Sequence, residues 1–458
     1  MMIETLNWII LSYFLVLWVG YIIFLTSSIK GILNKYKQSL NNNFINILVQ
    51  SHSIPVTVIM PLYNFANKVD FAIEGILNSN YPDIRLIIVN DGSTDNTLEH
   101  LIKVYELEKV LPAFKNSLVT APINCIYQSK KFNQMTVIDK THYSVISSGA
   151  DANNAALNIC QTPLFMTVDS DTVLDPSAIT NMVYCYLTYP HCIAIGGNIY
   201  IPDEQTSLNK PIKHQIPRNL NLGAQVVEYL RSFFYGHEGW SSIGGALCHS
   251  GACTMFERRA VEEVGGFDRD NYSYDSEIIM KLHHFMRKKG FPYSVAYSSP
   301  SIAWASQPDT LIGLWNQRNR WQRGLWRSFF THIKMLFNPF YGATGLVAFP
   351  FYFLFEILGP VVEGVAYILF FLVLITHGVD VNLVFWFIIM AWSYLYLITT
   401  SCIFLNYLTY EQYHLKRDLF YLLGITFLEL IFYRPFRGIG AVWSTLQYMF
   451  NRLLGKCL

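Results

Sequence analysis

The chain is poor in charged residues, which make up only 14% of its 458 residues, and its formal net charge is +1. Such a balance gives no electrostatic argument for a nucleic-acid partner, which would require a basic surface. The 8 cysteines are scattered and form no C-x-x-C pair, so neither a zinc site nor a disulfide framework is expected. The polar part of the chain is therefore expected to lie in a reducing cytosol.

The beginning of the chain lacks the basic start, short apolar core and small-residue cleavage site of a signal peptide. Residues 8–29 carry no charge and are long enough to cross a bilayer. Positive charges follow at Lys30, Lys35 and Lys37, so the positive-inside rule places the residues after them in the cytoplasm. We expect residues 1–30 to form a transmembrane anchor.

The middle of the chain alternates short apolar strands with helical segments. Residues 56–60 and 86–90 are predicted strands, the first stopped by Pro61, and residues 69–78 between them show helical apolar spacing. Segments of these lengths form βαβ units, whose ligands bind at the carboxyl ends of the strands. Asp91 lies at such an end.

A further apolar run leads into Asp169-Ser170-Asp171. Alternate residues of an extended segment point the same way, so both carboxylates are expected to face one small target. Adjacent anions repel unless a cation lies between them, and oxygen ligands at this spacing suit Mg²⁺ or Mn²⁺ bridging to a phosphate. The alternative is a polar turn after a strand, since Asp and Ser are common in turns.

Two other aspartates have both a structural and a functional interpretation. Asp151 lies in a predicted short helix, residues 151–157, where an Asp is first of all a helix-start residue. Asp275 precedes a predicted helix over residues 278–288 and would serve as its N-terminal cap. Asp275 is also positioned to act as a general base if that helix end faces the cleft.

Residues 315–330 alternate tryptophan with arginine, a composition typical of a helix that lies in a membrane interface. Gln317, Arg320 and Trp321 form a Q-x-x-R-W set on one side of this helix. The arginine is suited to hold a diphosphate, and the tryptophan to bind a sugar ring. We expect residues 306–340 to form amphipathic interface helices.

Long apolar runs return in residues 341–458, where we expect a transmembrane region of three or four hydrophobic segments. The first run is predicted to be broken at Gly359-Pro360, with Glu356 and Glu363 on either side. Acidic residues at mid-membrane mark a cavity or pathway, whereas at the membrane interface they need no such role. Both interpretations remain open at this point.

The ordered motifs resemble those of membrane-embedded, inverting family 2 glycosyltransferases, including cellulose, hyaluronan and especially poly-N-acetylglucosamine synthases. The resemblance covers nearly the whole chain. It is carried by V-N-D-G-S (Asp91), D-S-D (Asp169, Asp171), S-Y-D (Asp275) and Q-R-N-R-W (Gln317, Arg320, Trp321). It implies an α/β fold of the GT-A type over residues 50–305, Rossmann-like with a mixed sheet, inserted between N- and C-terminal transmembrane helices.

The resemblance also implies roles for single residues. Asp275 would be the catalytic base, and Asp169 and Asp171 would hold Mg²⁺ or Mn²⁺. The nucleotide-sugar would be bound by residues from three of these motifs and from two neighbouring segments: Tyr63, Asp91, Asp151, Asp169, Ser170, Gln317, Arg320 and Trp321.

The implied activity is the transfer of a sugar from a UDP-sugar to a β-linked polysaccharide at the cytosolic face of a bacterial inner membrane. UDP-N-acetylglucosamine is the donor that the resemblance favours. Export of the polymer, with accessory subunits, would follow from the same resemblance. Transfer of a single sugar to a lipid acceptor and a catalytically degenerate relative are alternatives. A transporter or scaffold that only binds a ligand is a third, but such a protein would not need Asp275.

Three positions depart from the family pattern. Tyr274 stands where the third motif, T-E-D or G-E-D, has glutamate, and Gly149 stands where a K-A-D-A-L-N-like segment has lysine. Phe65 replaces the glutamate of Y-N-E. The missing lysine removes a phosphate contact and the tyrosine alters the acceptor side, so these changes bear on donor identity and efficiency more than on the fold.

Overall fold

The computed structural model describes residues 2–66, 69–111, 117–143, 148–203, 215–376, 381–410, 413 and 416–455. Its centre is a ten-stranded sheet with the order β3-β4-β5-β2-β1-β6-β9-β8-β10-β7. The strands are β1 (Val56–Leu62), β2 (Ile84–Asp91), β3 (Leu107–Val110), β4 (Ile123–Ser129), β5 (Met135–Lys140), β6 (Leu164–Thr167), β7 (Thr172–Leu174), β8 (Cys192–Tyr200), β9 (Thr254–Glu257) and β10 (Ser294–Ala305). Strand β1 pairs in parallel with β2 and β6, whereas β9 pairs antiparallel with β6 and β8, which confirms a mixed α/β sheet.

Strand β1 does not stop at Pro61 as predicted but continues to Leu62. The N–H of Val168 donates to the carbonyl of Ile59, so the odd-numbered residues of β1 direct their backbone groups toward β6. Because β6 ends at Thr167, the missing N–H of Pro61 removes no ladder bond.

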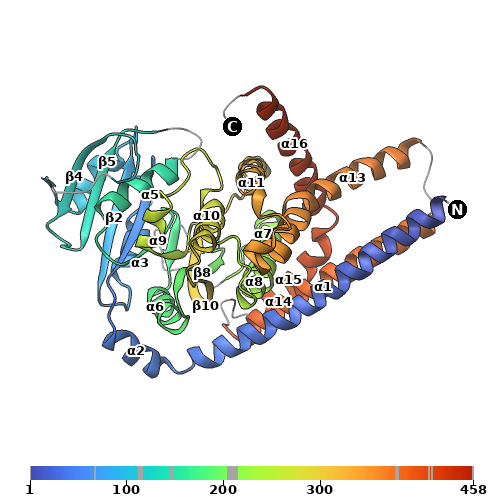
Figure 1. Cartoon of the computed structure of the whole chain (residues 1–458), viewed down its shortest axis with the longest axis horizontal. Coiled ribbons are helices and arrows are strands. Elements are labelled where there is room, and N and C mark those ends of the chain that lie inside the picture. Colours follow the sequence, from blue (N-terminus) through green and yellow to red (C-terminus); the bar gives the residue numbers. More distant parts are fainter. Residues whose placement is uncertain are drawn as a thin grey trace.

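Helices cover both faces of the sheet (Figure 1). Val58 and Met60 belong to one buried cluster and Ile59 to another, as the alternation along a strand requires. On the first face lie α2 (Asn42–Ser51), α3 (Val69–Leu77), α4 (Thr97–Val104) and α6 (Ala178–Thr188). On the second lie α5 (Ser148–Ile159), α9 (Arg258–Glu263) and α10 (Tyr274–Lys289).

A further group of helices lies between the sheet and the long terminal helices. It contains α7 (Leu220–Leu230), the π-helical η1 (Arg231–His237), α8 (Glu238–Ser242) and α11 (Leu311–Thr331). Helix α11 includes the predicted tryptophan–arginine helix. Two short 3-10 turns, Ile333–Met335 and Pro339–Tyr341, follow it.

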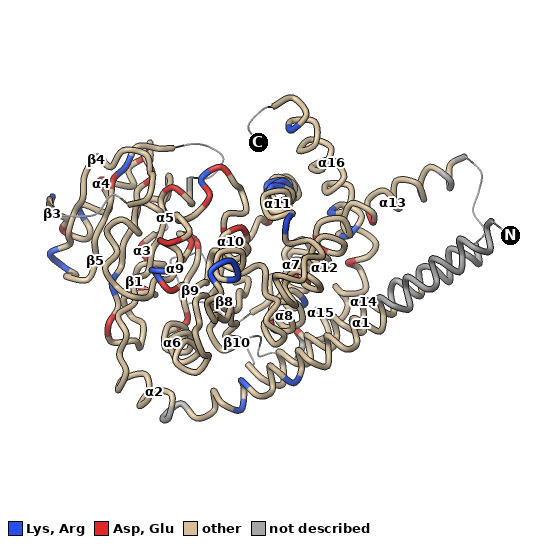
Figure 2. Tube along the Cα trace, in the orientation of Figure 1, with Lys and Arg blue, Asp and Glu red and all other residues tan. Residues whose placement is uncertain are grey.

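Three long helices extend away from the sheet: α1 (Met2–Ser39), α13 (Leu358–Thr376) and α14 (Val381–Leu408) (Figure 1). Helices α1 and α14 lie side by side, and the rings of Trp18 and Tyr21 both contact Tyr394. The outer part of α13 carries no charged side chain (Figure 2). The side chains of residues 1–17, which form much of the expected anchor, lie outside the described part of the structure.

Within the described residues, one helix is long and apolar enough to cross a membrane, Thr344–Leu372. A second span would require α15 (Lys416–Glu429) and α16 (Tyr433–Leu453) to count together, because α15 from Asp418 onward meets α16 at a bend of 49°. Helix α15 is thus a short helix, and the chain bends sharply after it into α16.

The predicted break at Gly359-Pro360 is wrong, because the helix Thr344–Leu372 continues through it. Upstream of Pro360 its π-helical turns, Thr344–Ala348 and Tyr352–Ile357, are separated by α12 (Phe349–Phe351). A π-helical turn changes the hydrogen-bond spacing, which lets the helix accommodate a residue without an N–H.

Candidate active site

Asp169-Ser170-Asp171 follows β6 after one residue, Val168, and lies in a turn and not in the extended backbone that the sequence predicted. The N–H of Thr172 donates to the carbonyl of Asp169 at 3.0 Å and closes this turn. Because β2, β1 and β6 are parallel neighbours, the turn and Asp91 lie at the same edge of the sheet.

A cavity of about 1580 Å³ begins at these carboxylates and extends to the helix Thr344–Leu372. Many of the predicted site residues line it: Asp169, Asp171, Asp275, Gln317, Arg320 and Trp321. The fold therefore brings together the turn after β6, the start of α10 and the middle of α11. Ser170 does not line this cavity.

The carboxylates in the cavity repel one another. Burial first, and then the charges of Asp171 and Asp275, raise the pKa of Asp169 to about 7. No group of three or more His, Cys, Asp or Glu among the described residues is arranged to hold a metal ion by itself. Asp169 and Asp171 nevertheless fit a divalent ion that takes its remaining ligands from a diphosphate, as Mg²⁺ commonly does.

Asp275 is not the N-cap of its helix. Helix α10 begins at Tyr274 with Ser273 as N-cap, so Asp275 lies in the first turn. Its Oδ2 accepts from the N–H of Gly251 at 3.1 Å, and its Oδ1 accepts from the N–H of Ser276 at 2.9 Å. Burial raises the pKa of Asp275, which brings a carboxylate closer to the range where it acts as a base at neutral pH.

Helix α11 presents its Q-x-x-R-W residues to the same cavity. The Nε2 of Gln317 donates to Oε1 of Gln307 at 3.1 Å. The guanidinium of Arg318 lies 4.2 Å from the centre of the Trp321 ring, a cation–π contact that orients the indole. Trp321 keeps 38% of its surface exposed, so this side chain is accessible to a ligand.

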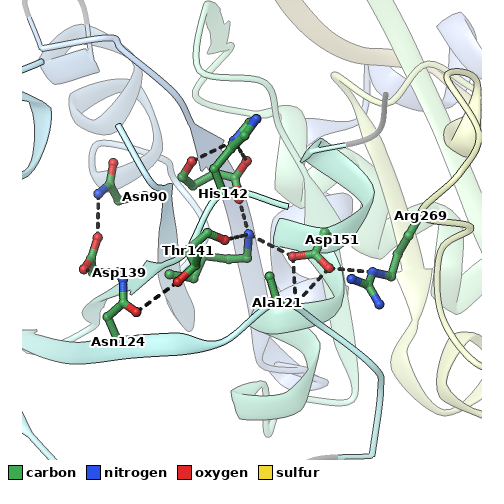
Figure 3. A network of polar contacts seen from close by, with 10 residues as sticks. Asn90, Ala121, Asn124, Asp139, Thr141, His142, Asp151 and Arg269 are labelled. Carbon is green, nitrogen blue, oxygen red and sulfur yellow. Dashed lines mark hydrogen bonds and ion pairs between the residues drawn. The ribbon is translucent and has the colours of Figure 1, made fainter. Parts of the chain in front are cut away.

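The other predicted nucleotide-binding residues, Tyr63, Asp91 and Asp151, do not line the cavity. Asp91 and Asp151 are buried and both pair with Lys140, whose Nζ lies 2.8 Å from Oδ2 of Asp151. Nε of Arg269 lies 2.6 Å from the other oxygen of Asp151 (Figure 3). We call Asp91, Lys140, Asp151 and Arg269 the ion-pair frame.

An aromatic stack adjoins the ion-pair frame. Nδ1 of His142 lies 2.8 Å from Oδ2 of Asp91. The His142 ring stacks on Tyr63 with a centroid distance of 4.8 Å and an angle of 29° between the ring planes. Tyr63 is 45% exposed, so the stack presents an aromatic surface at the end of β1.

The sequence reasoning missed Lys140, His142 and Arg269. Lys140 ends β5 directly opposite Asp91 in the parallel register of β5 and β2. The β-prone residues 137–138 are a signal for that strand, but nothing in the sequence assigns its neighbour. Arg269 lies in a turn far along the chain and carries no local signal at all.

The wall of the cavity toward the apolar helix contains charged residues in pairs. Glu356 and Glu363 both line the cavity, and Glu363 pairs with Arg434 at 3.0 Å. Glu228 pairs with Arg318 at 2.6 Å and with Arg437 at 2.7 Å. Glu356 and Glu363 thus line a cavity, whereas their position at mid-membrane or at the membrane interface stays a prediction.

Comparison with known families gives two matches. Residues 164–413 match the model described as "Glycosyl transferase family group 2", and residues 57–113 match "Glycosyl transferase family 2". The first match covers all the predicted site residues that line the cavity, from Asp169 to Trp321.

Two similar proteins are named poly-beta-1,6-N-acetyl-D-glucosamine synthase. The one from Staphylococcus epidermidis is 27% identical over 283 residues, which are 61% of this chain and 57% of the relative. The one from Staphylococcus aureus (strain MSSA476) is 27% identical over 290 residues, 62% of this chain and 59% of the relative. The matched part is thus less than two thirds of the length of either relative.

Among solved structures, a mannosyltransferase from Pyrobaculum calidifontis in complex with GDP-Man and Mn²⁺ is similar with a TM-score of 0.46 and 16% identity. The superposition covers 91% of this chain and 99% of that protein.

Proposed function

The chain belongs to glycosyl transferase family group 2, and from this premise we propose that it extends a β-linked polysaccharide from a UDP-sugar. UDP-N-acetylglucosamine is the proposed donor, because the two Staphylococcus relatives are named for a polymer of N-acetylglucosamine. The observation that carries the proposal is the cavity that joins Asp169, Asp171 and Asp275 to the apolar helix Thr344–Leu372.

The proposed setting is a bacterial inner membrane with the sheet domain on its cytosolic face. Residues 1–30 and 341–458 would contain the membrane segments, and α11 would lie at the interface. The apolar helix and the lysines that follow residue 29 support this arrangement.

On the donor side, Tyr63 would stack on the base with the His142 ring behind it, and the ion-pair frame would hold the strand ends around the ribose. Arg320 and Gln317 would contact the diphosphate from α11. Asp169 and Asp171 would hold a divalent ion, which when bound supplies positive charge to the departing diphosphate. The raised pKa of Asp169 supports this assignment, since a nearby cation is what would make three adjacent carboxylates tolerable.

Asp275 would take the proton from the acceptor hydroxyl. The hydroxyl oxygen then forms a bond to the anomeric carbon as the bond to the nucleoside diphosphate breaks on the opposite face, so the configuration inverts. The hydrogen bonds from Gly251 and Ser276 fix the direction of the Asp275 carboxylate for this step.

The acceptor would lie in the cavity between α11 and the helix Thr344–Leu372. Trp321 offers a flat aromatic surface of the kind on which a sugar ring stacks. The paired charges of Glu228 with Arg318 and of Glu363 with Arg434 offer hydrogen-bonding groups along a wall that is otherwise rich in aromatic residues. A polymer that leaves the site by this route would reach the membrane segments directly, which is the basis for proposing export.

The test uses membranes that contain the full chain, a panel of UDP-sugars, and Mg²⁺ or Mn²⁺. The expected result is UDP release with UDP-N-acetylglucosamine and a ladder of products in a mass spectrum. Asp275→Asn keeps the size of the side chain but removes the base, and should lower the rate by about 10²- to 10⁴-fold. Glu262→Gln, a matched change in a half-buried ion pair with Arg258 outside the cavity, should leave the rate unchanged. Intact protein that turns over no nucleotide-sugar would overturn the proposal.

A second function is favoured by the apolar part of the same cavity, where Phe351, Phe355 and Phe370 line the wall. A lipid acceptor would bury its chain there and receive a single sugar. The product distinguishes the two functions, since one glycolipid mass in place of a ladder would identify the lipid acceptor.

A further inference from the structure

Gly149 and Tyr274, two of the positions that depart from the family pattern, lie against each other. Gly149 is in the first turn of α5, and Tyr274 is the first residue of α10. A Cβ atom built on Gly149 would lie 2.5 Å from Oη and 3.1 Å from Cζ of Tyr274. While Tyr274 holds this position, even a methyl group at residue 149 would clash with it.

Tyr274 also faces the reactive carboxylates, because it lines the cavity together with Asp169 and Asp275. Its own burial, and then the charges of Asp169 and Asp275, raise the pKa of the phenol. The side chain is therefore a neutral hydroxyl beside negative groups. A glutamate in its place would add a further negative charge beside Asp169, Asp171 and Asp275.

The two departures therefore depend on each other. The family pattern places lysine at position 149 and glutamate at position 274, a pair with no net charge. Glycine and tyrosine also have no net charge together, so the electrostatic balance beside Asp169 is kept. A lysine alone would clash with Tyr274, and a glutamate alone would add its negative charge to those of Asp169 and Asp275.

We propose that Gly149 and Tyr274 form one compensated pair in which the phenol takes the place of a lysine–glutamate pair at the donor site. Tyr274 is then a positioning residue: its ring fills the space above the start of α5 and borders the diphosphate and metal carboxylates. The inference rests on the proposed donor site, and it predicts that each position tolerates change only together with the other.

The first experiment is a steric double-mutant cycle on the full chain in detergent, with the binding of UDP and Mn²⁺ as the readout. Gly149→Ala should weaken binding by about tenfold, because the methyl group pushes the ring into the cavity. Tyr274→Phe removes Oη and leaves Cζ, at 3.1 Å, as the nearest atom. Gly149→Ala/Tyr274→Phe should therefore bind UDP within about threefold of Tyr274→Phe alone. Gly424→Ala, in a helix with no atom within 4 Å of the added Cβ, is the matched control and should have no effect.

The second experiment restores the family residues. Gly149→Lys and Tyr274→Glu should each lower UDP release from the donor by at least about tenfold, and the double variant should regain most of the wild-type rate. Mn²⁺ titrations add a readout that a loss of packing alone would not change. Tyr274→Glu should shift the Mn²⁺ dependence, and Gly149→Lys/Tyr274→Glu should return it to that of the wild type.

Effects that simply add in both cycles would overturn the inference. If the wild type neither binds UDP nor releases it from any donor, the proposed function fails. The thermal unfolding of the same variants then tests, without any ligand, whether Gly149 and Tyr274 are coupled. Melting temperatures that fall in each single variant and recover in the doubles support the pair, and additive losses refute it.

Discussion

Two groups of charged residues at the same edge of the sheet differ in how their charge is balanced. In the ion-pair frame, Lys140 and Arg269 face Asp91 and Asp151, so two cations meet two anions inside the protein. In the cavity, Asp169 faces the carboxylates of Asp171 and Asp275, and its pKa is raised to about 7. The frame is complete without a ligand and joins β2, β5, α5 and the turn before α10. A cation bound beside the cavity carboxylates would offset the charges of Asp171 and Asp275 that contribute to the raised pKa of Asp169.

The comparison predicts that removing a charge from the frame costs stability. Lys140→Met leaves Asp91 and Asp151 buried without their shared cation, which should lower the free energy of unfolding by about 3–5 kcal/mol. Urea denaturation of the purified chain, followed by fluorescence, measures this change.

Lys130→Met is the matched control, because the pair of Lys130 with Glu108 is exposed, with 58% and 61% of the two side chains accessible. Its effect should stay below about 1 kcal/mol. Equal effects of the two substitutions would show that the frame does not hold the sheet edge together.

Removing a charge from the cavity should have the opposite effect on stability. The pKa of Asp169 is higher in the folded chain than its ordinary value, so the folded state retains a proton that the unfolded state has lost. Stability from this group is present at low pH and is lost as pH rises toward about 7. Asp169→Asn cannot ionise and should unfold at a higher temperature than wild type at about pH 8 without metal.

The same variant should release UDP about 10²- to 10³-fold more slowly, because it loses a ligand for the ion that faces the leaving group. Calorimetry and UDP release, measured on one preparation, test the expected rise in unfolding temperature and the expected loss of rate. A variant less stable than wild type at high pH would contradict the picture of an unbalanced cavity.

The sequence predicted the cavity better than the frame, for a physical reason. Asp169 and Asp275 stand in short motifs near the end of a strand and at the start of a helix, and Arg320 stands in a motif in the middle of α11. Parallel strands bring their carboxyl ends to one edge of the sheet. The partners of Asp91 depend on which strand lies next to β2, and that order is a property of the whole sheet. Lys140 could therefore be identified as a partner of Asp91 only from the register in which β5 pairs with β2.

The compensation between Gly149 and Tyr274 could not be predicted either. The sequence separates the two residues by more than a hundred positions, and each looks like an independent loss of a functional group. Only the 2.5 Å approach to Oη shows that one departure makes room for the other. The continuous helix at Pro360 was likewise hidden, because a π-helical turn has no sequence signal of its own.

The unbalanced cavity also predicts a pH dependence of ligand binding. A divalent ion binds the ionised form of Asp169, so binding of UDP with Mn²⁺ must release the proton below a pH of about 7. The affinity should rise by about tenfold for each pH unit up to this value and level off above it. Titration calorimetry in buffers of different ionisation enthalpy detects the proton directly. In Asp169→Asn the rise of affinity with pH should disappear. If the rise persists, the released proton comes from another group.

The smallest effect is expected where the frame meets the ligand. His142→Ala removes the ring behind Tyr63 and one hydrogen-bond partner of Asp91, and should weaken UDP binding by about 3- to 10-fold. His52→Ala changes an exposed histidine at the end of α2 and should have no effect. The melting temperature of His142→Ala should stay near that of wild type, because Lys140 still pairs with Asp91. If His142→Ala loses as much stability as Lys140→Met, His142 belongs to the ion-pair frame. Of the two stacked rings, only Tyr63 would then belong to the ligand site.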